Sequence, residues 1–104
     1  MLGYEEIRLR MIEMTDEIRS KRTDRGYKEL DFSTMMVWIK EDFLNVQKAL
    51  DECSEIIEQF EEYEKSHEED KDQLQELYPM AAVIGNAKAK YEHKLHEYKL
   101  FLGK

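Results

Sequence analysis

The stretch that decides the fold runs from Met35 to Asp70 and reads MMVWIKEDFLNVQKALDECSEIIEQFEEYEKSHEED. Its apolar residues recur at alternating steps of three and four, which is the repeat of an amphipathic helix. The next two places of the repeat hold Glu64 and His67, so the apolar seam turns polar there. The residues that carry the repeat are Met36, Ile39, Phe43, Val46, Leu50, Cys53, Ile57 and Phe60.

A second set of apolar residues widens the face of this helix. With Met36 at heptad position a, position g holds Met35, Ala49, Ile56 and Tyr63. A face three positions wide indicates packing against two neighbouring helices. Val37, Trp38 and Leu44 point away from that face, so we expect another surface to cover the beginning of this helix.

Two further helices flank the central one. The same spacing predicts helices over residues 3–22, 33–66 and 72–102. Gly26 is expected to end the first helix, and Asp31 or Ser33 to cap the second. Asp72 with Gln75 resembles a capping box for the third helix, in which Pro79 either makes a kink or lies in the first turn.

These elements predict an all-α fold, an antiparallel three-helix bundle in which the second and third helices form a long coiled-coil hairpin. The 104 residues contain four glycines and one proline, and we expect one helical domain over residues 1–104. Because the first helix is shorter than the other two, the hairpin is expected to overhang it near Glu64 as a two-helix stalk.

Charge is distributed unevenly along the chain. The net charge is −8, and residues 33–72 hold thirteen acids against four bases. This bias argues against a broad nucleic-acid surface, which needs clustered lysine and arginine, and favours a basic protein surface as the partner. Residues 1–10 read MLGYEEIRLR, and the charge at the fifth position argues against an apolar signal peptide. No stretch of the sequence is as apolar as a membrane span. We therefore expect a cytoplasmic protein that binds no membrane.

No set of residues predicts catalysis, a metal site or a cofactor. Glu64 and His67 have the E-x-x-H spacing of a helical metal site, but no further ligands are expected to face them. Cys53, the only cysteine, lies on the apolar seam and is expected to be a small core residue. We therefore expect a protein that is not an enzyme.

The remaining pattern predicts a non-enzymatic protein-protein interaction module, comparable to small acidic phage inhibitors or adaptors that bind a host protein. We expect a homodimer, a basic protein partner, or both, with an apolar contact end and an acidic tip. The alternative is an accessory protein that binds single-stranded nucleic acid through residues 19–28 and the third helix, where KAKYEHKLHEYK alternates bases and aromatic residues. The predicted partner-binding residues are Val37, Trp38, Leu44, Glu58, Glu61, Glu62, Glu68 and Glu69.

Overall fold

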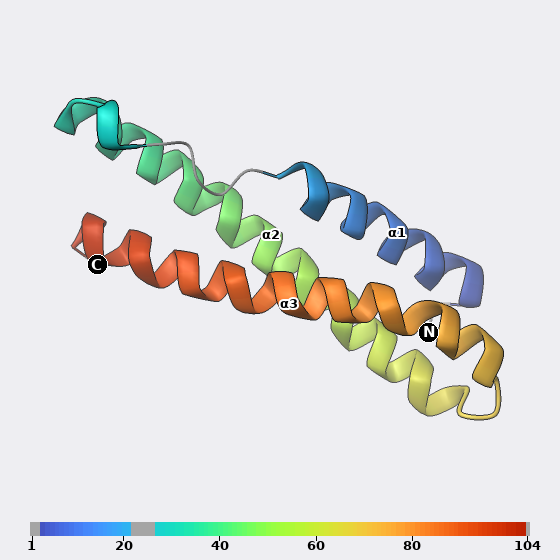
Figure 1. The fold of residues 1–104 in the computed structure, drawn as a ribbon. Coiled ribbons are helices and arrows are strands. Elements are labelled where there is room, and N and C mark those ends of the chain that lie inside the picture. The colour runs from blue at the N-terminus through green and yellow to red at the C-terminus, as the bar shows by residue number, and fades with distance from the viewer. Residues whose placement is uncertain (1–2, 22–26, 104) are drawn as a thin grey trace.

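The computed structural model describes residues 3–21 and 27–103, and these residues fold into helices (Figure 1). They form α1 (Tyr4–Ser20), a short 3-10 helix η1 (Tyr27–Glu29), α2 (Phe32–Ser66) and α3 (Lys71–Leu102). No strand occurs within the described ranges. The all-α three-helix bundle predicted from the sequence is confirmed.

The ends of the helices follow the local sequence in part. Asp31 caps α2, because its carboxylate accepts a hydrogen bond from the Thr34 amide at 2.7 Å. The capping box predicted at Asp72 is wrong, since α3 begins at Lys71 and has no side-chain cap. Pro79 lies inside α3 and does not start it. The predicted terminator Gly26 lies outside the described residues.

The position of α1 differs from the sequence prediction. The start of α1 lies at the turn between α2 and α3, where the Tyr4 ring is 6.4 Å from the Tyr63 ring and the Tyr4 hydroxyl bonds to Glu76 (Figure 1). Arg8 Nε donates to the same Glu76 carboxylate at 2.9 Å. The start of α1 therefore reaches the last turns of the hairpin, and the larger overhang of α2 and α3 lies at the opposite end and not at Glu64 as expected (Figure 1).

The connection between α1 and α2 explains this placement. Glu17, in the last turn of α1, lines a groove with Glu52, which lies about 30 Å along α2 from Phe32 at 1.5 Å per residue. Positions 21–31 separate the two helices, and eleven residues can reach about 36 to 40 Å when extended. The connection is thus long enough for α2 to begin well beyond the end of α1.

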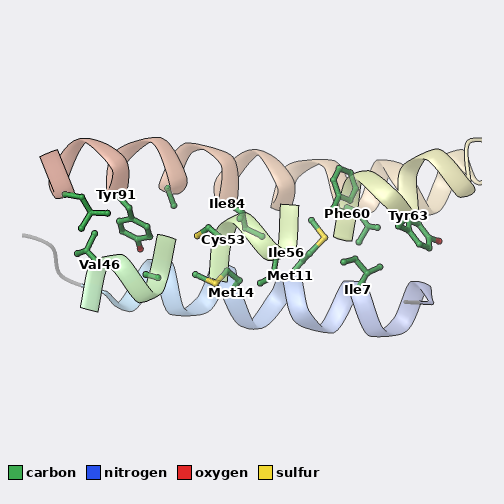
Figure 2. Close-up of a cluster of buried hydrophobic side chains, with 14 of the residues drawn as sticks. Ile7, Met11, Met14, Val46, Cys53, Ile56, Phe60, Tyr63, Ile84 and Tyr91 are labelled. Carbon is green, nitrogen blue, oxygen red and sulfur yellow. The ribbon is translucent and has the colours of Figure 1, made fainter. Parts of the chain in front are cut away.

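The core lies where all three helices meet (Figure 2). Met11 and Met14 of α1 face Cys53 of α2 and Ile84 of α3. In α2 the buried positions are d and g, whereas the predicted a positions are only partly buried, because α1 packs on the g side. The buried apolar side chains at d and g are Ile39, Val46, Ala49, Cys53, Ile56, Phe60 and Tyr63.

The apolar face of α3 is buried along most of its length, from Leu74 to Tyr98. Tyr91 and Tyr98 belong to the core, while His93 and His96 are exposed. None of the described helices is both long and apolar enough to cross a membrane.

Candidate functional site

At one end of the bundle α2 and α3 extend beyond the last turn of α1, which reaches as far as Lys90 and Tyr91. We call this part the open end and define it as residues 32–48 of α2 and 88–102 of α3 (Figure 1). Among the described residues, seven large apolar side chains are exposed, and five of them lie at the open end. These five are Phe32, Val37, Leu44, Leu100 and Phe101.

The exposed residues of α2 form a stripe. Val37 and Leu44 are seven residues apart, so they lie on the same side of the helix, and their exposed fractions are 54% and 68%. The predicted outward direction of both side chains agrees with this exposure. Trp38 is half-buried, so this side chain contributes to the interior as well as to the surface.

The exposed residues of α3 lie at its C-terminal end. Leu100 and Phe101 line one shallow groove together with Glu97. Their exposed fractions of 70% and 58% match those of the stripe on α2. The open end thus carries an apolar stripe on α2 and an apolar groove on α3.

A hydrogen bond ties η1 to the open end. The Tyr27 hydroxyl donates to the carboxylate of Asp42, which is 6% exposed and lies on the buried face of α2. Burial raises the pKa of Tyr27, and the bond to Asp42 raises it further, with Tyr98 of α3 beside them. This contact holds η1 against α2 and α3 at the open end. The apolar repeat does not predict this bond, although Asp42 lies three residues after Ile39 and four before Val46, which is the spacing of a core position.

The opposite end of the bundle is acidic. We call residues 58–72, around the turn between α2 and α3, the acidic tip. The five glutamates predicted to bind a partner are all exposed there and spread over the last turns of α2 and the turn itself. They are Glu58, Glu61, Glu62, Glu68 and Glu69.

Glu64 and His67 have structural roles at this tip. The Tyr78 hydroxyl donates a hydrogen bond to Glu64 at 2.7 Å. The His67 ring stacks on Tyr63 at a centroid distance of 4.0 Å. No group of three potential metal ligands occurs within the described residues.

The charges of the two ends differ strongly. Residues 51–72 hold eleven acids and two lysines, whereas the open end holds six bases and four acids. The molecule is 55 Å long. Since charges separated by more than the Debye length of about 8 Å at physiological ionic strength are largely screened, a partner at one end experiences mainly the charge of that end.

The basic residues predicted to bind single-stranded nucleic acid lie close together only at one place in the described structure. Lys21, Lys90 and Tyr91 line one groove between α1 and α3. Tyr91 is 2% exposed, so its ring has no free face on which a base could stack. Lys94 and His93 are each within ion-pair distance of Glu97. Positions 22–26 lie outside the described residues.

The remaining reactive group is the thiol of Cys53. It is 0% exposed, and burial raises its pKa to about 11. A thiol in this environment is neutral at physiological pH and inaccessible to substrates. Cys53 therefore packs in the core, as the sequence predicts.

Comparison of the chain with protein-family profiles, with curated proteins and with solved structures finds no match.

Proposed function

We propose that this chain is a non-enzymatic protein-interaction module that binds through its open end. The observation that carries the proposal is the concentration of exposed apolar side chains on the two-helix layer, five of the seven among the described residues. Exposed apolar side chains gathered at one end of a small protein are typical of a contact with another protein. Covering such surface releases free energy at about 25 cal/mol per Å².

The acidic tip has a second role in this proposal. Its five exposed glutamates attract a basic protein surface and so raise the rate of encounter. The apolar residues of the open end, by contrast, supply most of the binding free energy. The proposed protein acts in the cytoplasm as an inhibitor or adaptor, since binding alone is sufficient for either activity.

The experiment compares proteins retained from a native cell lysate by the parent chain and by three variants. Leu44→Asp changes the stripe on α2, and Trp38→Ala removes the half-buried ring beside it. Leu9→Asp is the matched control, because Leu9 is 56% exposed but lies on α1, away from the open end. Circular dichroism and urea unfolding establish that each variant is folded.

We expect one or more proteins to be retained by the parent and by Leu9→Asp, and lost with Leu44→Asp and Trp38→Ala. The same proteins retained by all four baits would show that the open end is not the contact surface. Retention of single-stranded nucleic acid by the parent at physiological salt, lost on neutralising Lys90, would favour the alternative function.

A further inference from the structure

We propose that the groove between α1 and α3 binds an acidic amphipathic helix of another protein. Ile18 of α1 and Val83, Ala87 and Tyr91 of α3 supply its apolar lining. None of the five exposed apolar residues of the open end lines this groove, so it is a second surface, independent of the proposed function. Three observations support a helix as its occupant: the direction of the two helices, the apolar lining and the charges around it.

The two helices that form the groove run side by side in the same direction. Tyr4 of α1 bonds to Glu76 of α3, and Ile18, further along α1, lines the groove with Tyr91, further along α3. The two chains advance by nearly the same number of residues between these contacts, so α1 and α3 stay adjacent over most of the length of α1 (Figure 1). A further helix laid along such a pair packs as in a four-helix bundle.

The groove is apolar and shallow. Ile18 and Val83 are half-buried, so part of each side chain stays accessible in it. Its volume is about 280 Å³, at the lower limit of the about 300–1,000 Å³ of small-molecule pockets, and it is open to solvent. It therefore suits one or two side chains of a helix better than an enclosed small molecule. The exposed side chains of Ala82 and Asn86 in α3 are small, which allows a helix to approach closely.

Cationic side chains from both helices lie at the groove. Lys21, which follows α1, and Lys90 of α3 line it. Arg19 is exposed in the last turn of α1, eleven residues after Arg8. Because eleven residues make about three helical turns, Arg19 lies on the same side of α1 as Arg8, whose guanidinium bonds to Glu76 of α3.

The stretch of α3 along the groove contains no acid. Residues 77–91 hold two lysines and no aspartate or glutamate, although the chain has 24 acids. On α1, Glu13 and Glu17 line a different groove, against α2. Since charges farther away than the Debye length of about 8 Å are largely screened, a segment in the groove experiences mainly the charges beside it.

An apolar groove with cationic edges is complementary to a helix that has an apolar stripe and carboxylates next to it. The apolar side chains of such a helix would enter the groove, and its carboxylates would approach Lys21 and Lys90. Single-stranded nucleic acid fits less well, because Tyr91 is 2% exposed and offers no face on which a base could stack.

The probe is a displayed library of random peptides of about 20 residues, since shorter helices are marginal in water. The library is selected on the purified chain at physiological salt, and the Kd of each enriched peptide is measured by fluorescence anisotropy. We expect peptides with apolar residues three and four positions apart and with aspartate or glutamate next to them. Their addition should change the backbone amide chemical shifts most at Ile18, Val83 and Ala87.

Lys21→Glu combined with Lys90→Glu should raise the Kd of these peptides by about 10-fold or more, because each substitution replaces an attraction by a repulsion. Lys65→Glu combined with Lys71→Glu is the matched control. It makes the same change in net charge at two exposed lysines of the acidic tip, and should change the Kd less than about threefold. Peptides whose acids are replaced by lysine should bind the first variant more tightly than the parent. Circular dichroism should show the same helicity for all three proteins.

Three outcomes would overturn the acidic helix as the occupant. One is a selection that enriches no peptide. Another is a set of peptides that binds the variant with both groove lysines reversed as tightly as the parent. The third is a single-stranded oligonucleotide of about 20 thymidines that binds at physiological salt and displaces the peptides, which would assign the groove to nucleic acid. The proposed function is tested separately by Leu44→Asp, which should bind these peptides as the parent does.

Discussion

Tyr27 of η1 donates a hydrogen bond to the carboxylate of Asp42, one of two buried polar side chains among the described residues. The bond joins the connection between α1 and α2 to the beginning of α2, where α1 itself is absent. It therefore stabilises the part of the bundle that carries the exposed apolar residues.

We expect Tyr27→Phe to lower the free energy of unfolding by about 1–3 kcal/mol, because it removes a donor from a buried carboxylate. Urea unfolding followed by circular dichroism measures the change. Tyr78→Phe is the control, since Tyr78 also donates to a carboxylate, Glu64, but is 44% exposed. Equal effects of the two substitutions would show that burial of Asp42 adds nothing to the Tyr27 bond.

Much of the fold follows from the spacing of apolar residues, and two features do not. Periodicity places Ile39, Val46 and Cys53 in the core correctly, because a helix buries one face whatever its neighbours are. Periodicity does not show which half of the long helix α2 is covered by the shorter helix α1. That placement depends on the connection between them, residues 21–31. The partners of Asp42 and Glu76 come from segments distant in sequence, so no local pattern reveals them.

Stability should decrease in alkaline solution. Burial raises the pKa of Cys53 to about 11 and that of Tyr91 to about 12. A raised pKa in the folded state stabilises the fold fully below the unfolded values of about 8.5 for cysteine and about 10 for tyrosine. This stabilisation is lost as the pH rises through the folded values, because the unfolded chain then releases its protons first.

The urea midpoint at several pH values between 8 and 12 measures this dependence. We expect it to be constant near pH 8 and to fall progressively above about pH 9. Cys53→Ala should remove the earliest part of the decline, since it removes the group with the lowest unfolded pKa. If the urea midpoint of the unsubstituted protein does not change up to pH 11, the burial of Cys53 and Tyr91 is contradicted.

Neutralising the acidic tip should stabilise the isolated chain. Replacing Glu58, Glu61, Glu62, Glu68 and Glu69 by glutamine removes like-charge repulsion throughout the tip. At the first three positions it also removes negative charge near the C-terminal end of α2, where the helix dipole is negative. Glu68 and Glu69 instead lie just before α3, whose positive N-terminal dipole end offsets part of the gain. We expect a gain of about 1 kcal/mol at low salt, or about 4–8 °C in melting temperature. Thermal unfolding followed by circular dichroism measures it.

The matched control for this variant is the pair Glu5→Gln and Glu6→Gln. These acids lie in the first turn of α1, where the dipole favours negative charge, so their removal should lower the melting temperature. A five-site variant that melts below the parent at low salt would indicate that the tip glutamates make stabilising contacts. The tip would then have a structural role in addition to any role in binding.

If the chain associates with a second copy, the most direct test of association through the open end is the distance between spin labels on the two chains. Single cysteines introduced at Lys99, in the open end, and at Lys65, in the acidic tip, are exposed. Cys53 stays unlabelled because it is buried and its pKa is raised to about 11. Pulsed electron paramagnetic resonance then measures one intermolecular distance for each label position. We predict a short distance between the labels at position 99 and a distance greater than the 55 Å length of one chain between those at position 65. A short distance at position 65 with a long one at position 99 would contradict association through the open end.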